Sequence, residues 1–408
     1  MTYGSVLSNR EFSAMLLGHA LSSFGDQVAR IALAVLVFRQ THSPLAASAT
    51  YAVFFFGYLV AGPFVSALSD RLARRGVMVT SDLARAGLML LLALPHLPVV
   101  VLFVLLVVVS LLTPAFESAR SATLPDVLAG EAYPKGQALF NVAFQGTQVA
   151  GFVAGGALLS AYTVSELLTF NAATFLVSAG VILGWTLGRP PAAHTRPPSN
   201  VFRETAEGFS IVTRDPKLRL LLAYALLGAA AVATPEGLAV PVAAELHGGS
   251  LAAGVLTSAI PAGFVIASVV VLRLPPERRI SLLPLLAALA TVPLLATPAA
   301  TSVPAVTLLW LLSGLGSSLQ LVASSAYGQA VPPHARARAF GLATSGLMAV
   351  QGLAQLAGGA LAVGVGPRAA VSLFALFVLV VLLGIGRAGT NPALLPQESP
   401  VALRENAS

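Results

Sequence analysis

The segment SDRLARR at residues 69–75 separates two long apolar runs, and it constrains the fold more than any other feature of the chain. The run before it, 51–68, and the run after it, 77–94, are each long enough to cross the hydrocarbon core of a bilayer. Charges at this density cannot lie in hydrocarbon, so the segment predicts a tight aqueous hairpin between two transmembrane helices. We therefore expect a polytopic membrane protein.

The composition supports the same conclusion. Of the 408 residues, 56% are hydrophobic and 10% are charged, whereas a soluble globular chain carries roughly 25% charged residues. There is no cysteine, which excludes disulfides and cysteine metal sites. The chain has no phosphate-binding loop, and its six histidines lack metal-ligand spacing. We predict no enzyme activity, no metal and no cofactor.

Twelve apolar runs have spanning length and are separated by charged or Pro/Gly-containing breaks. The predicted spans are 12–38, 47–68, 77–95, 98–118, 136–162, 165–187, 217–243, 250–273, 281–298, 303–326, 338–364 and 367–387.

The predicted fold class is an all-α membrane protein, with twelve transmembrane helices in two pseudo-symmetric bundles of six. An internal repeat supports this plan, because the hexapeptide at 153–158 (VAGGAL) recurs at 356–361 (LAGGAL). The alternative is chance, since such strings are common in membrane helices. The predicted domains are an N-terminal bundle at 1–188, a cytoplasmic linker at 189–216, a C-terminal bundle at 217–388 and a cytoplasmic tail at 389–408.

The basic residues predict the orientation. Lys and Arg favour cytoplasmic loops, and most of the 23 fall on one side if the N-terminus is inside. The exceptions are Arg30 and Arg85, within spans, and Arg39 and Arg368, in loops of the other side. Both termini are therefore expected in the cytoplasm. The same loops explain the net charge of +7 without a nucleic-acid partner.

Residues 66–75, SALSDRLARR, resemble the signature loop of the major facilitator superfamily, although small residues replace both of its glycines. Three further stretches, at 22–26, 81–86 and 114–126, are similar to the drug-efflux branch that contains macrolide and enterobactin exporters. Residues 202–220 resemble the central linker of that branch. The chain departs from drug/proton antiporters in lacking an arginine between Val99 and Pro114.

The resemblance implies a secondary transporter of the bacterial inner membrane that works by alternating access, without a nucleotide-driven motor. It implies export of bulky amphiphiles such as drugs, secondary metabolites or siderophore-like compounds. Proton antiport is the expected driving reaction. Expected partners are the small-molecule substrate, protons and membrane lipid, with the monomer as the functional unit. The alternatives are an uptake symporter on the same fold and a non-transporting scaffold or receptor.

Asp26 is the leading candidate for proton coupling. It lies near the middle of the first span, where an unpaired carboxylate is costly, and a carboxyl group held away from water can exchange a proton near neutral pH. Arg30 lies four residues later on the same helical face, so a static Asp26–Arg30 pair is the alternative. Glu236 occupies nearly the equivalent place in the seventh span. It either faces the same cavity or lies at the outer water boundary. Asp82 and Arg85 are expected to neutralise each other.

The family resemblance assigns conformational gating to the charged loop and to charges after the fourth span. The gating candidates are Asp70, Arg71, Arg74, Arg75, Arg120 and Asp126. The alternative is a loop whose charges only set the orientation.

Two further groups of residues lie within the predicted spans. Polar side chains there must face protein or a cavity, and an aromatic stripe on the second span can stack on a large substrate or simply pack. The candidate substrate contacts are Tyr51, Phe55, Tyr58, Asn141, Gln145, Gln148, Gln320, Gln351 and Gln355. Small residues that allow close helix packing are Gly151, Gly155, Gly156, Gly358 and Gly359.

Overall fold

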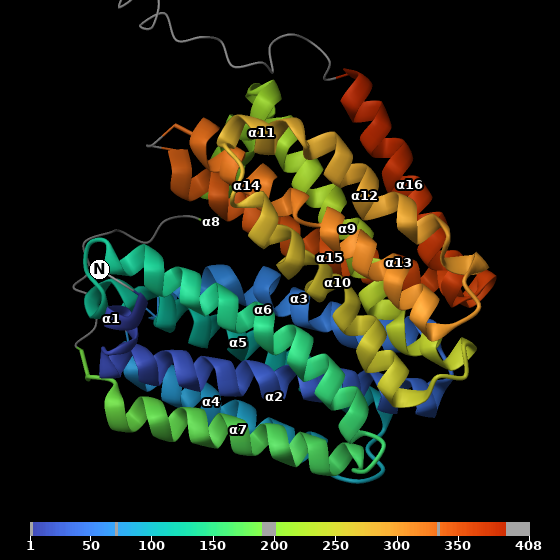
Figure 1. Ribbon diagram of the computed structural model, residues 1–408. Helices are drawn as coiled ribbons and strands as arrows, with labels where there is room; N and C mark the ends of the chain where they lie inside the picture. The colour runs from blue at the N-terminus through green and yellow to red at the C-terminus, as the bar shows by residue number, and fades with distance from the viewer. Residues whose placement is uncertain (1–2, 70–71, 190–200, 333–334, 389–408) are drawn as a thin grey trace, which may run out of the picture.

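The computed structural model describes residues 3–69, 72–189, 201–332 and 335–388, and these residues form only helices and connecting turns (Figure 1). Within these ranges eight helices are long and apolar enough to cross a membrane, judged by length and composition. They are Arg10–Thr41, Val99–Val127, Val164–Trp185, Pro216–Glu245, Gly249–Val271, Val303–Ala330, Arg338–Val365 and Pro367–Ile385. The predicted all-helical membrane fold is confirmed at this level.

One group of helices comes from the first half of the chain and is coloured blue to green in Figure 1. In this group α2 packs on α3, α6 and α7, while α4 contacts α5 and α7. The bounds are α1 (Tyr3–Leu7), α2 (Arg10–Thr41), α3 (Pro44–Ser69), α4 (Arg74–Leu92), α5 (Val99–Val127), α6 (Ala132–Leu158) and α7 (Val164–Trp185).

The second group comes from the rest of the chain, and its helices α9 and α10 are joined to the first group through contacts with α3, α6 and α2. Its bounds are α8 (Val201–Arg214), α9 (Pro216–Glu245), α10 (Gly249–Val271), α11 (Pro276–Ser281), α12 (Leu283–Leu295), the 3-10 turn η1 (Thr297–Ala299), α13 (Val303–Gly316), α14 (Leu319–Ala330), α15 (Arg336–Val365) and α16 (Pro367–Ala388).

Local sequence signals fix several of these helix ends. The Asn9 side chain accepts a hydrogen bond from the Phe12 amide at 3.1 Å and caps α2. Thr163 and Glu166 form a reciprocal capping box at the start of α7. Asp215 caps α9, and Pro216 occupies its first turn, where no backbone donor is needed.

Each predicted span overlaps a helix, but the lengths differ. The fourth predicted span ends at 118, whereas α5 continues to Val127 through Pro114 and Pro125. The tenth, 303–326, is divided into α13 and α14 at Ser317 and Ser318. The second predicted span, 47–68, lies entirely within α3 (Pro44–Ser69), and the ninth, 281–298, corresponds to a shorter apolar stretch at Leu283–Ala299.

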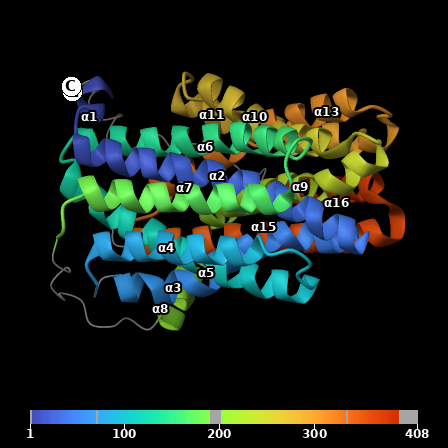
Figure 2. The same cartoon turned by 90° about the horizontal axis from the view of Figure 1, so that it is seen from below.

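The most extensive contacts between the two groups are those of α3 with α15 and of α6 with α10, and Figure 2 shows the molecule from the side of α4 and α7. In the first pair, the Ser48 hydroxyl donates to the Gln355 carbonyl at 2.5 Å. In the second pair, a Cβ added to Gly156 would lie 2.8 Å from the Cα of Gly254. These contacts lie at the beginnings of α3 and α10 and near the ends of α6 and α15. All four helix ends belong to the predicted outer side.

Candidate functional site

The candidate site is centred on Asp26, in the middle of α2. Gly25 permits this placement, because a Cβ there would meet Asn171 and Thr174 of α7. The close approach brings the Asn171 side-chain amide within 3.4 Å of Asp26 Oδ1. Arg85 Nη1 of α4 lies 3.9 Å from Asp26 Oδ2, and 17% of the Asp26 side chain is exposed. The carboxylate therefore has only long polar contacts and retains access to its surroundings.

Arg85 is engaged mainly by another carboxylate. It forms an ion pair with Asp82, and both side chains are almost fully buried. The guanidinium carbon lies 4.4 Å from the ring centroid of Phe175 and 5.0 Å from that of Phe116. Cation–π contacts with these two rings therefore also stabilise the position of the Arg85 side chain. The prediction that Asp82 and Arg85 neutralise each other is confirmed.

Arg30 is placed differently. Its guanidinium carbon lies 4.2 Å from the Phe54 ring centroid, and its buried Nε has no hydrogen-bond partner in the structure. Among the described residues no Asp26–Arg30 ion pair forms within 4.0 Å, so the alternative of a static pair is not found. Arg30 nevertheless interacts electrostatically with both Asp26 of α2 and Glu236 of α9. Glu236 is half-buried.

A second charged cluster lies on the same side of the molecule and was missed by the sequence reasoning. Glu117 of α5 forms an ion pair with Arg120, and His19 Nδ1 of α2 lies 3.4 Å from Glu117. The Arg120 guanidinium carbon is 4.2 Å from the ring centroid of Phe140 in α6. The available signal was an acid within the fourth predicted span. Arg120 was assigned to gating, but its ionic partner is Glu117 of its own helix.

The charged end of α4 forms a separate cluster. Arg74 donates to Asp126 at 2.6 Å and to the Ala122 carbonyl at 2.7 Å, whereas Arg75 donates to the Leu183 carbonyl of α7. These contacts join α4 to α5 and α7 within the first group of helices. Asp70 and Arg71 lie outside the described residues, so their gating role stays a prediction.

Glu11 and Arg189 form a further ion pair beside the α4 cluster. Arg189 donates to Glu11 through both terminal nitrogens, at 2.5 and 2.9 Å. The side-chain hydrogen bond with Glu11 raises the pKa of Arg189 above its ordinary value. The pair fixes the end of the first group of helices to the start of α2.

The aromatic stripe of α3 runs past the charged residues. Tyr51 is buried, with its ring 6.4 Å from that of Phe152 in α6, and it interacts electrostatically with Glu236 and Arg30. Tyr58, two turns further on, interacts electrostatically with Asp26 and Glu117. Phe55 lies opposite Gly352 of α15, 3.4 Å from the position of an added Cβ. The stripe thus borders both charged clusters.

The predicted amide contacts fall in different environments. Gln355 is fully buried, and neither end of its amide has a hydrogen-bond partner in the structure. Gln351 donates to the Leu347 carbonyl of its own helix at 3.1 Å. Asn141 is exposed, and the remaining three are half-buried: Gln145, Gln148 and Gln320. Gln27, which the sequence reasoning omitted, is buried with its carbonyl oxygen unpartnered.

The predicted packing glycines lie where helices approach closely. A Cβ at Gly151 would be 2.7 Å from Gln27 Cβ, and one at Gly155 would be 3.0 Å from Val28 Cα, both on α2. Gly156 faces α10, as described above. Gly358 faces Thr234 of α9, and a Cβ at Gly359 would lie 2.8 Å from Ser48 Cβ of α3. Glycines of this set therefore lie on both helix pairs that join the two groups.

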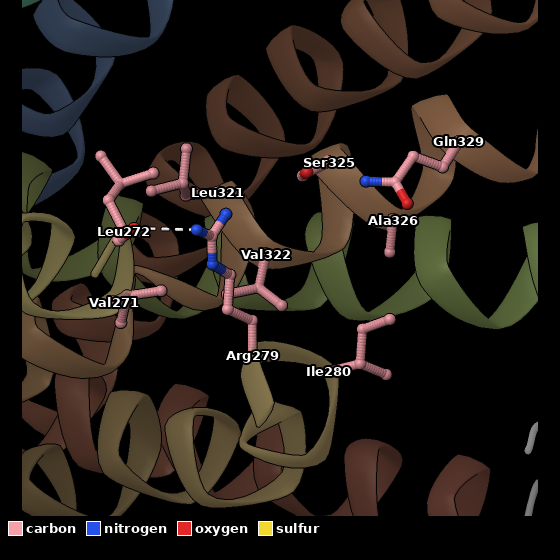
Figure 3. Close-up of a pocket in the computed structure, with 9 residues that line it drawn as sticks. All are labelled: Val271, Leu272, Arg279, Ile280, Leu321, Val322, Ser325, Ala326 and Gln329. Atoms are coloured by element: carbon pink, nitrogen blue, oxygen red, sulfur yellow. Dashed lines mark hydrogen bonds between the residues drawn. The ribbon is translucent and has the colours of Figure 1, made fainter. Parts of the chain in front are cut away.

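A surface pocket lies apart from these residues, between α10, α11 and α14 (Figure 3). Arg279 lines it and donates to the Leu272 and Leu274 carbonyls at 2.8 Å each, which satisfies the end of α10. Ser325 and Gln329 lie across from it. None of the predicted site residues lines this pocket, so it is separate from the charged site.

Comparison with known proteins places this arrangement in a family. A family model described as the Major Facilitator Superfamily matches residues 15–330. The uncharacterized MFS-type transporter YfiS of Bacillus subtilis (strain 168) is 29% identical over 170 residues, which cover 41% of this chain and 40% of that protein. The lysophospholipid transporter LplT of Serratia proteamaculans (strain 568) is 27% identical over 191 residues, covering 47% and 46%. Each alignment spans less than half of the relative's length.

Solved structures agree on the fold. A mutant of the nucleoside transporter NupG superposes with a TM-score of 0.78 at 13% identity, covering 93% of this chain and 100% of that one. A bacterial homologue of the human lysosomal transporter Spinster, inward-facing and occupied, gives a TM-score of 0.74 at 14% identity, covering 95% and 98%. At these identities the likeness concerns the fold alone.

Proposed function

The chain belongs to the Major Facilitator Superfamily, and from that premise we propose that it exports bulky amphiphilic molecules by alternating access in exchange for protons. Members of this superfamily are transporters and not enzymes. The drug-efflux branch, the direction of transport and the coupling ion are parts of this proposal.

The observation that carries the proposal is that the Asp26 carboxylate has only weak polar contacts among the described residues. This carboxylate lies in the middle of a candidate membrane span, with an amide at 3.4 Å and a guanidinium at 3.9 Å as its polar contacts. Arg85 pairs more closely with Asp82, so Asp26 shares its nearest described cation with a second carboxylate. A partly exposed intramembrane acid without a tight partner is a suitable proton carrier.

The contacts between the two groups of helices support alternating access. We propose that all twelve apolar segments cross the membrane, in two six-helix bundles at 1–188 and 217–388, with both termini in the cytoplasm of a bacterial inner-membrane protein acting as a monomer. The α3–α15 and α6–α10 contacts then close the outer side, and the site around Asp26 opens inward. Rocking of one bundle against the other would separate these contacts.

The residues around Asp26 combine aromatic and charged groups, which supports an amphiphilic cargo. The aromatic stripe at Tyr51, Phe55 and Tyr58 offers apolar surface beside the charges of Asp26 and Arg30. The match to a relative named as a lysophospholipid transporter supports the same class of molecule.

The test is an accumulation panel in an efflux-deficient bacterium. Wild type is compared with Asp26→Asn, with and without a protonophore, and Glu131→Gln serves as a control because Glu131 is exposed at the start of α6. We expect wild type and the control to lower accumulation of at least one amphiphile, and both Asp26→Asn and the protonophore to abolish the effect. An Asp26→Asn protein that exports like wild type would refute coupling through Asp26. Greater accumulation in wild type would instead identify an uptake carrier.

A further inference from the structure

We infer that Arg30 is the anchor for an anionic oxyacid group of the cargo, such as a phosphate, sulfonate or carboxylate. This inference rests on the proposed function, since it assumes that an amphiphile enters the site between the two groups of helices. It narrows the cargo from amphiphiles in general to those with an anionic or zwitterionic head group.

Arg30 differs from the other interior arginines of the first group of helices. Arg85 is paired with Asp82, and Arg120 is paired with Glu117. Arg30 has no carboxylate within 4.0 Å in the part of the chain that the structure describes. Its contact is the face of Phe54, and its Nε is buried without a hydrogen-bond partner. Arg85 Nε and Arg120 Nη1 are also buried without a hydrogen-bond partner, but each of those guanidinium groups has a carboxylate of its own. Among these three arginines, Arg30 is therefore the one whose guanidinium group has no ionic partner within 4.0 Å among the described residues.

The position of Arg30 suits a ligand contact. It follows Asp26 by one helical turn on α2, and it interacts electrostatically with Tyr51 of α3 and Glu236 of α9. Helix α3 belongs to the same group of helices as Arg30, and α9 belongs to the other group. The helix that carries Arg30 also contacts both α3 and α9 directly. Arg30 thus lies on a helix where the two groups meet, which is where a cargo must bind if either group is to release it.

The chemistry of the guanidinium favours an oxyacid. Asp26 and Glu236 offset the charge of Arg30 at longer range, but they leave its N–H donors unsatisfied. An unsatisfied donor in a buried site is costly, and a planar guanidinium matches phosphate or carboxylate oxygens in a bidentate geometry. The Phe54 face holds the plane of the group, so less side-chain entropy is lost on binding. A trimethylammonium head group has no acceptor for these donors, and the hydroxyl oxygens of a neutral sugar accept hydrogen bonds from a guanidinium without the added attraction of a negative charge.

The experiment measures binding of four radiolabelled amphiphiles with the same alkyl chain to purified protein in galactolipid nanodiscs, whose lipid carries no phosphate group that could compete for Arg30. Their head groups are a phosphate monoester, a phosphocholine, a trimethylammonium and a maltoside. The variants are Arg30→Gln and Arg30→Lys. Arg39→Gln is the matched control, because Arg39 is exposed in the last turn of the same helix.

We expect wild type and Arg39→Gln to bind the phosphate and phosphocholine probes at least about tenfold more tightly than the other two. Arg30→Gln should weaken binding of the phosphate-bearing probes by about tenfold to a hundredfold and leave maltoside binding unchanged. Unchanged maltoside binding also shows that the variant is folded. Arg30→Lys should bind the phosphate-bearing probes with an affinity between those of wild type and Arg30→Gln, since it keeps the positive charge and loses the planar bidentate donor geometry.

Equal loss of all four probes in Arg30→Gln would overturn the inference, because it would mean that Arg30 only balances Asp26 and Glu236. A wild-type preference for the trimethylammonium probe would overturn it as well. If wild type binds amphiphiles without any preference among head groups, this inference fails while the proposed function stands. If wild type binds none of the four, both fail.

Discussion

The crossing of α6 and α10 at Gly156 and Gly254 leads to a quantitative prediction about Gly156→Ala. A Cβ at Gly156 would lie 2.6 Å from the Ser250 carbonyl oxygen and 2.8 Å from the Gly254 Cα. Both atoms belong to the backbone, so they cannot rotate away and the two helices must separate. Overpacking of this kind costs about 1–3 kcal/mol. The cost falls on the conformation in which the outer contacts are formed and not on one in which they are separated.

Gly156→Ala is therefore expected to raise the population with separated outer contacts by about 5- to 150-fold. The chain has no cysteine, so a single introduced cysteine is the only thiol in the protein that a maleimide can label. Ser48→Cys is a suitable reporter, because Ser48 is fully buried in the α3–α15 contact and not in the perturbed α6–α10 contact. The measurement is the rate of labelling by a membrane-impermeant maleimide added to the outer face.

Gly146→Ala is the control for Gly156→Ala. Gly146 lies on the same helix, and a Cβ there would have no heavy atom within 4 Å. Both substitutions gain the same helix propensity, so their difference isolates the contact with α10. Equal labelling rates in the two variants would refute the reasoning that the glycine crossing holds the outer side closed. A faster rate in Gly156→Ala would also show that the two helix pairs open together.

Two further predictions concern ion pairs. Glu117→Gln should destabilise the protein by about 3–5 kcal/mol, because Arg120 is then buried without a carboxylate. The double substitution Glu117→Gln with Arg120→Gln should recover part of the loss in thermal unfolding, and a double variant less stable than the single one would contradict this explanation. By contrast, the Arg74–Asp126 pair is partly exposed, so a double-mutant cycle should give a coupling of about 0.2–1 kcal/mol that weakens with added salt. A larger, salt-independent coupling would contradict a surface ion pair.

The helices were predictable from the sequence because the bilayer imposes the length and polarity of each span. Each of the twelve predicted spans overlaps a helix, although α5 continues past its predicted end to Val127 and the short helices α1 and α11 were not predicted. The division of the tenth span at Ser317 and Ser318 was not predictable in this way. Gly316, just before the division, lies against the backbone of α12, and hydropathy carries no information on such contacts.

The candidate site was predictable only in part, because ionic partners depend on which helices become neighbours. Asp82 and Arg85 are three residues apart on one helix, so their pairing could be expected. The contact of Asp26 with Asn171 joins α2 to α7, across most of the first half of the chain. No local spacing predicts it. The same holds for His19 and Glu117.

The distribution of interior charge indicates which contacts can drive a conformational change. The strong pairs Asp82–Arg85 and Glu117–Arg120 lie each within one helix of the first group, so a relative movement of the two groups leaves them intact. In the spans of the second group that the structure describes, Glu236 is the one acid or base placed deep in a helix, and its electrostatic partner Arg30 belongs to the first group. A ligand shifts a conformational equilibrium only through contacts that differ between the two states. Since Arg30 and Glu236 interact electrostatically from different groups, protons and cargo that bind there would act on interactions that change during the movement.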